Sequence, residues 1–155
     1  GNNAKQSSVA AITEDLDTGV GRVMESIDKL GLADTTYVIY MSDNGAGGGR
    51  RTGLNGGKGT MWEGGIRVPF IVCGPGVASN SWCDVPVVGY DLYPTFCEWA
   101  GVSSGKLPKN IEGGSIASLL ANNGKGEVKR AREELVFHFP HYQSDDDGPH
   151  WVISS

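Results

Sequence analysis

Apolar residues recur at steps of three and four along the first part of the chain. They are Val9, Ile12, Leu16, Val20, Val23, Ile27 and Leu30. This spacing predicts an amphipathic helix over residues 8–31, capped at its start by Ser7 or Ser8. Gly31 is expected to close the helix in the left-handed conformation, which glycine adopts without steric cost.

Shorter apolar runs predict strands. The runs are residues 37–41, 68–72, 135–139 and 151–153. Two further helices are expected over 90–100, where Pro94 suits the first turn, and over 115–121. Residues 122–132 are rich in Gly, Lys and Arg and are predicted to be an exposed linker. This mixture predicts an α/β fold with a parallel or mixed central sheet flanked by helices.

Two oxygen-bearing side chains follow the first predicted strand. Asp43 and Asn44 come directly after residues 37–41, and ligands of open α/β sheets bind beyond the carboxyl ends of the strands. Carboxylate and amide oxygens are hard ligands that suit Ca²⁺ or Mg²⁺. The plainer alternative is that both residues stabilise a turn, as Asx residues often do.

Lys58 lies in a glycine-rich stretch, residues 45–65, which carries much of the excess among the chain's 24 glycines. Glycines without side chains let backbone segments approach closely and leave Lys58 uncrowded. An ammonium in this place could bind an anion as a compact point charge, or it could be an ordinary surface lysine. Glu63 and Arg67 are four residues apart and are expected to form a structural ion pair, with Trp62 packed under the loop.

Four sequence blocks resemble the sulfatase family of the alkaline-phosphatase-like superfamily. They are Ser-Asp-Asn-Gly at 42–45, Gly-Gly-Lys-Gly-Thr at 56–60, Trp-Glu-Gly-Gly-Ile-Arg-Val-Pro at 62–69 and Pro-Gly at 75–76. Milder similarity covers Asp-Leu-Tyr-Pro-Thr at 91–95 and Phe-His-Phe-Pro-His-Tyr at 137–142. The resemblance implies a fragment of an alkaline-phosphatase-like sandwich. Residues 1–130 would be the later part of the catalytic domain, and 131–155 the start of a C-terminal subdomain.

The resemblance also implies a chemistry, the hydrolysis of sulfate esters by a formylglycine nucleophile and a divalent metal, Ca²⁺ or sometimes Mg²⁺. Asp43 and Asn44 would be metal ligands. Lys58 would be a catalytic residue that binds a sulfate oxygen. His141 or His138, on either side of Pro140, would border the substrate pocket, although both could instead be structural histidines. The substrate would be a sulfated small molecule or a glycan, and the compartment would be the periplasm, the cell exterior or the lysosome.

The family's nucleophile motif, C-x-P-S-R, does not occur in this chain. Cys73-Gly74-Pro75 matches its start, but Ser and Arg do not follow. The chain is therefore expected to be inactive alone and to work with the N-terminal part of the same enzyme as its partner. Two alternatives are a phosphonate or phosphodiester hydrolase of the same superfamily and a non-catalytic binding module.

Composition excludes several other classes of function. The net charge of −5 argues against nucleic acid or an anionic membrane as a partner, and no apolar run approaches the length of a membrane span. The three cysteines lack the spacing of a zinc site and cannot all pair. Free thiols are expected.

Overall fold

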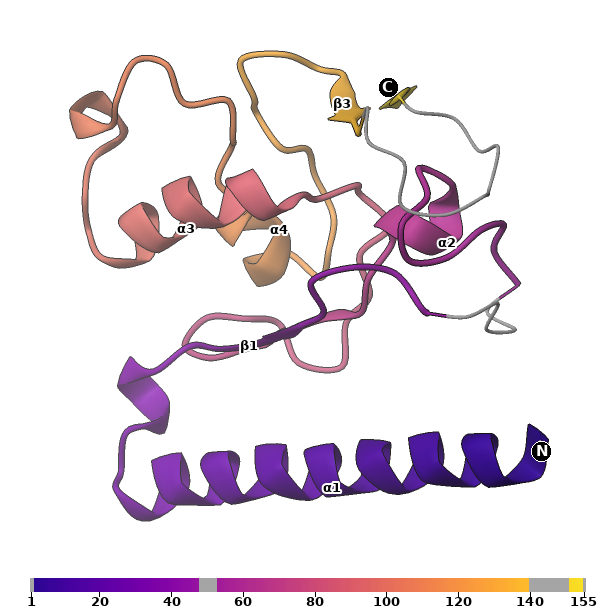
Figure 1. The fold of residues 1–155 in the computed structure, drawn as a ribbon. Helices are drawn as coiled ribbons and strands as arrows, with labels where there is room; N and C mark the ends of the chain where they lie inside the picture. The colour runs from indigo at the N-terminus through magenta and orange to yellow at the C-terminus, as the bar shows by residue number, and fades with distance from the viewer. Residues whose placement is uncertain (1, 48–52, 140–150, 155) are drawn as a thin grey trace.

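The computed structural model describes residues 2–47, 53–139 and 151–154. Its helices and strands alternate up to α3, and α4, β3 and β4 then follow (Figure 1). They are α1 (Asn2–Lys29), β1 (Val38–Met41), α2 (Glu63–Ile66), β2 (Phe70–Cys73), α3 (Leu92–Trp99), α4 (Ala117–Ala121), β3 (Leu135–His138) and β4 (Trp151–Ser154). Single 3₁₀ turns lie at Ala33–Thr35, Gly89–Asp91 and Ser104–Lys106. Within this described part, no helix is both long enough and apolar enough to cross a bilayer.

Helix α1 confirms the first predicted helix but begins at Asn2, before the serines predicted to cap it. The preceding residues include Ala4, Lys5 and Gln6, which favour helix and let it extend. Gly31 ends the helix with φ +68°, as predicted. The apolar stripe of α1 is largely exposed, and the helix runs along one side of the molecule, apart from the other elements (Figure 1).

The strands form two separate antiparallel pairs. Val38 of β1 lies opposite Cys73 of β2, and Met41 lies opposite Phe70. In the second pair, Leu135 of β3 lies opposite Ser154 of β4. Of the two predicted alternatives, a mixed sheet allows the antiparallel pairing of β1 with β2, whereas a wholly parallel sheet does not. Parallel neighbours need a crossover connection, whereas residues 42–69 reverse the chain at one end of the pair.

The core is small. Its buried apolar side chains among the described residues are Ile116 at the start of α4, Leu119 in α4 and Leu135 in β3. The fully buried hydroxyl of Thr95 donates to the Asp91 carbonyl at 2.6 Å and accepts the Ile116 N–H at 3.0 Å. These two bonds tie the first turn of α3 to the start of α4. Elsewhere, Tyr37 beside β1 stacks on Trp99 of α3, with ring centroids 3.8 Å apart.

A buried ion pair lies beside this core. Arg130 Nε donates to Asp91 Oδ1 at 2.9 Å, and Arg130 Nη2 donates to Oδ2 at 2.6 Å. The side chain of Asp91 is 0% exposed and that of Arg130 is 9% exposed. The N–H groups of Val88 and Gly114 complete the carboxylate's hydrogen bonds at 2.9 and 3.0 Å. The bonds to Asp91 raise the pKa of Arg130 above its ordinary value.

Most of residues 122–132 are exposed, as predicted, but the ion pair shows that this segment is not a free linker. Arg130 also donates to the Pro86 carbonyl at 2.8 Å, so the segment is fastened to the body of the molecule. Composition suggested a solvated linker, because Gly, Lys and Arg are usually exposed. The arginine here is held by a partner 39 positions earlier in the chain. The predicted domain boundary at 130/131 stays a prediction.

Candidate functional site

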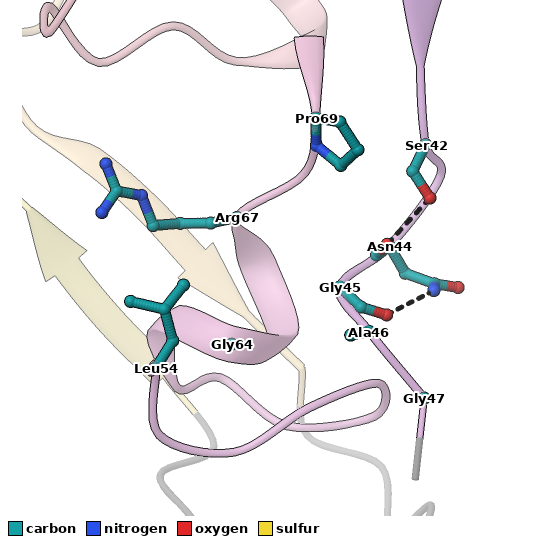
Figure 2. A pocket seen from close by; sticks show the side chains of 9 residues that line it. All are labelled: Ser42, Asn44, Gly45, Ala46, Gly47, Leu54, Gly64, Arg67 and Pro69. Carbon is teal, nitrogen blue, oxygen red and sulfur yellow. Dashed lines mark hydrogen bonds between the residues drawn. The ribbon is translucent and has the colours of Figure 1, made fainter. Parts of the chain in front are cut away.

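The turn after β1 holds Asp43 and Asn44. Ser42 Oγ donates to the Asn44 carbonyl at 3.0 Å, and Asn44 Nδ2 donates to the Gly45 carbonyl at 2.9 Å (Figure 2). The second bond uses the amide nitrogen and leaves Asn44 Oδ1 as an acceptor. Asp43 is exposed and Asn44 is half-buried. Both side chains can therefore offer oxygen to a cation at the end of β1.

Glycine contacts join this turn to α2. The Gly45 N–H donates to the Gly65 carbonyl at 2.9 Å, and the Gly64 N–H donates to the Asn55 carbonyl at 2.7 Å. A Cβ added to Gly45 would overlap the carbonyl oxygen of Gly64, and one added to Gly65 would overlap that of Thr60. The close backbone approach predicted from the glycine content is confirmed.

Lys58 is attached to the same turn through its backbone. Its N–H donates to the Ala46 carbonyl at 2.9 Å, two residues beyond Asn44. The Lys58 side chain is exposed, and no ion pair or hydrogen bond holds its ammonium among the described residues. The fold thus brings the lysine loop to the Asp43–Asn44 turn and leaves the charge available to a ligand.

Three residues at the two ends of α2, Trp62, Glu63 and Arg67, have structural contacts beside the site. Arg67 Nη1 lies 3.4 Å from Glu63 Oε2, which confirms the predicted ion pair. Both side chains are largely exposed, so the pair contributes little stability. Trp62 lies against Gly56, as the predicted packing requires, but 43% of its surface is exposed.

A cleft of about 460 Å³ lies between the turn after β1 and α2 (Figure 2). The residues that line it are Ser42, Asn44, Gly45, Ala46, Gly47, Leu54, Gly64, Arg67 and Pro69. Asn44 is the predicted site residue that reaches this cleft, whereas Asp43 and Lys58 are not among the lining residues. Figure 2 shows the Arg67 guanidinium directed away from Asn44.

Asp43 and Asn44 fit a divalent metal only as part of its ligand shell. Ca²⁺ takes six to eight oxygens, and two residues supply about two or three. In the part of the chain that the structure describes, no group of three or more His, Cys, Asp and Glu side chains could hold a metal. A complete site needs ligands from outside these residues.

The remaining candidate residues are histidines and cysteines. His141 lies outside the described residues, and His138 is an exposed residue at the end of β3. Cys73, Cys83 and Cys97 are free thiols, as predicted. Cys73 lies opposite Val38, at the far end of the β1–β2 pair from Asp43. With a rise of about 3.3 Å per residue, the ladder alone separates those ends by about 10 Å. Cys73 is therefore not placed to act as the nucleophile of this site.

Sequence reasoning assigned no role to Thr60 or Asp91. The Thr60 hydroxyl binds the N–H and the carbonyl of Gly57, the residue before Lys58. Its sequence signal was a threonine three residues after a glycine, the spacing of a turn closed by a side chain. For Asp91 the only indication in the sequence was weaker, a carboxylate just before a predicted helix. No sequence feature indicated that Arg130 is its partner.

Comparison with known proteins shows the family to which the chain belongs. The family model described as Sulfatase matches residues 5–102. A sulfatase of Formosa agariphila is 37% identical over 166 residues, which cover 96% of this chain and 29% of that protein. The steryl-sulfatase of Rattus norvegicus is 38% identical over 140 residues, covering 81% of this chain and 23% of the relative.

Structural comparison gives the fold. The solved structure of BT4656 in complex with its substrate D-glucosamine-2-N,6-O-disulfate aligns with a TM-score of 0.69 and 26% sequence identity. The alignment covers 90% of this chain and 27% of BT4656. This confirms the predicted α/β fold as a fragment of the alkaline-phosphatase-like sandwich, whose members in the sulfatase branch depend on a metal. The chain spans less than a third of the length of the relatives it matches. The matched family model and the shared fold show that this chain belongs to the sulfatase family.

Proposed function

We propose that the complete protein containing this chain hydrolyses sulfate esters, converting R–O–SO₃⁻ and water into an alcohol and inorganic sulfate. One observation carries the proposal. The bond from the Lys58 N–H to the Ala46 carbonyl fastens a lysine loop to the turn that carries Asp43 and Asn44. The Lys58 ammonium can bind a tetrahedral anion, and the side-chain oxygens of Asp43 and Asn44 can bind a metal beside that anion.

Each residue has a distinct part in the proposed reaction. Asp43 and Asn44 would hold Ca²⁺, with Mg²⁺ as the alternative; when bound, the metal supplies Lewis-acid polarisation of a sulfate oxygen. Lys58 would donate to another sulfate oxygen and offset the charge that develops in the transition state. The attacking hydroxyl would come from a formylglycine hydrate outside residues 1–155. His141 is proposed, with less support, to border the substrate.

We propose a sulfated sugar as the substrate class. The support is the fold shared with BT4656, whose substrate is a disulfated glucosamine. The same family membership supports a compartment outside the cytoplasm for the complete protein. Steryl-sulfatase gives an alternative substrate class to compare in the same assay, a sulfated sterol.

The test uses the complete protein and a substrate panel. The panel contains an aryl sulfate, a sulfated glucosamine, a sulfated sterol, an aryl phosphonate and a phosphodiester. We expect turnover of the sulfates, highest for the sulfated sugar, and loss of turnover with a metal chelator that Ca²⁺ restores. Faster hydrolysis of the phosphonate or the diester would instead support the phosphoesterase alternative. Absence of turnover with every compound would support the non-catalytic module.

Helix α1 has an exposed apolar stripe that could contact the proposed partner. Val9, Ile12 and Val23 of its apolar stripe are 43%, 66% and 55% exposed. Burial of such side chains would stabilise the protein by about 1.5–3 kcal/mol each. We propose that the rest of the same protein, which makes up most of the length of the relatives, covers this stripe.

A further inference from the structure

Lys58 sits in a turn that has little stiffness of its own. Residues Gly57 and Gly59 flank it, and Gly56 and Gly59 adopt φ values of +70° and +90°. Glycine has the largest conformational freedom of any residue. A lysine between glycines would therefore sample many positions unless another group fixed the turn.

Thr60 fixes both backbone groups of Gly57. Its hydroxyl donates to the Gly57 carbonyl at 2.9 Å and accepts the Gly57 N–H at 3.2 Å. Its own N–H donates to the same carbonyl at 3.0 Å. These three bonds close the turn around Lys58, because Gly57 and Thr60 lie on either side of it in the sequence.

The space around the Thr60 hydroxyl exists because neighbouring residues lack side chains. A Cβ added to Gly65 would lie 2.8 Å from Thr60 Oγ1, and one added to Gly56 would overlap that oxygen. Thr60 is half-buried, so its hydroxyl has few alternative partners in water. The glycines of the loop and of α2 thus leave the space that the Thr60 hydroxyl occupies.

We propose that Thr60 is a positioning residue for the sulfatase reaction. It does not touch the substrate. It holds the 57–60 turn so that the Lys58 ammonium meets the sulfate in the transition state, while the Ala46 contact sets where the turn lies. This inference rests on the proposed function of Lys58.

The test is a double-mutant cycle in the complete protein, with kcat and KM for an aryl sulfate and a melting curve for each variant. The variants are Thr60→Val, Thr60→Ser, Lys58→Ala and Lys58→Ala/Thr60→Val. Thr60→Val keeps the shape and removes the hydroxyl, so kcat/KM should fall by about 10- to 100-fold, mainly through kcat. Thr60→Ser should restore most of it. In the Lys58→Ala background, Thr60→Val should have almost no further effect.

The outcomes separate this inference from the proposed function. If Lys58→Ala is impaired but Thr60→Val matches wild type, or lowers kcat/KM equally in both backgrounds, the positioning role of Thr60 is wrong and the role of Lys58 stands. If Lys58→Ala itself keeps wild-type kinetics, both assignments are wrong. Thr60→Ala, run through the same cycle, replaces the valine variant if that protein does not fold.

Discussion

At the scale of single residues, the site depends on glycines, because the backbone segments that form it pack too closely to leave room for side chains. Gly45, Gly57, Gly64 and Gly65 let three backbone segments meet at carbonyl contact distance. The side chains that carry the proposed chemistry, Asp43, Asn44 and Lys58, project from these segments. Their relative positions are therefore set by glycine packing and by backbone hydrogen bonds.

Gly45→Ala tests this dependence. The added methyl group would overlap the carbonyl oxygen of Gly64, so the turn after β1 must move away from α2. We expect a loss of stability of about 1–3 kcal/mol, the scale of overpacking, together with a loss of sulfatase activity in the complete protein. Differential scanning calorimetry and aryl sulfate kinetics measure the two effects.

Gly105→Ala is the matched control for this substitution. Gly105 is exposed, it lies in the 3₁₀ turn Ser104–Lys106, and an added Cβ would meet no atom within 4 Å. It should leave melting and kinetics close to wild type. Equal effects of Gly45→Ala and Gly105→Ala would show that close packing at Gly45 does not matter.

The sequence could predict the residue types of the site but not all of their contacts. The Asp43–Asn44 pair after an apolar run and the glycines around Lys58 were readable, because both signals are local. The bond from Lys58 to Ala46 joins residues 12 positions apart, and the role of Thr60 depends on which backbone groups its hydroxyl meets. Such contacts follow from loop conformation, which a run of glycines leaves open.

At the scale of elements, one buried ion pair joins segments that are distant in sequence. Asp91 receives hydrogen bonds from Arg130, Val88 and Gly114, so it links the start of α3 to the segments on both sides of α4. A buried carboxylate is stable only when its partners are complete. We infer that the pair fixes the register of these segments.

Asp91→Ala should therefore destabilise the complete protein by about 3–5 kcal/mol, because it leaves the buried Arg130 charge without compensation. Lys29→Ala is the control, since the Lys29–Glu25 pair on α1 is exposed and should contribute about 0.5 kcal/mol or less. Calorimetric melting of both variants compares them directly. Similar losses in the two variants would contradict a structural role for Asp91.

The elements themselves were largely predictable. The 3.6-residue period gave α1, and alternating or apolar runs between breakers gave β1, β2, β3 and β4 to within two residues. Pro94 lies in the first turn of α3, as predicted. Strand pairing could not be read from these patterns, because a short apolar run does not specify its partner strand or the direction of that partner.

At the scale of the whole molecule, the chain is a portion of a sulfatase fold. It covers 29% of the Formosa agariphila relative and leaves much of the α1 stripe exposed. Its described residues form two short sheets. The described residues supply two proposed metal ligands, and no group of three or more His, Cys, Asp and Glu side chains among them could hold a metal. Activity should therefore belong to the complete protein.

Metal binding by the isolated chain tests this view. Because Asp43 and Asn44 supply about two or three of the six to eight oxygens that Ca²⁺ prefers, affinity should be no tighter than roughly millimolar. Isothermal titration calorimetry with the chain and an Asp43→Ala variant measures it. Micromolar binding that disappears in Asp43→Ala would show that the site is complete without further ligands.

Turnover by the isolated chain is a separate expectation. Without an attacking group, orientation and charge stabilisation cannot produce covalent catalysis, so residues 1–155 alone should not release sulfate from an aryl sulfate. Sulfate release measured by ion chromatography checks this. If the isolated chain did release sulfate and Cys73→Ala abolished this activity, Cys73 would be the nucleophile and the expectation would be wrong.

The most direct measurement of the central claim is the kinetics of Lys58→Ala in the complete protein with an aryl sulfate. If Lys58 binds sulfate in the transition state, kcat/KM should fall by about 10²–10³, the scale for one lost oxyanion-stabilising donor. Lys58→Arg should restore it only in part, since a planar fork replaces a point charge. The exposed Lys106, in the 3₁₀ turn after α3, is the control, and Lys106→Ala should match wild type. Wild-type kinetics in a folded Lys58→Ala variant would contradict the account.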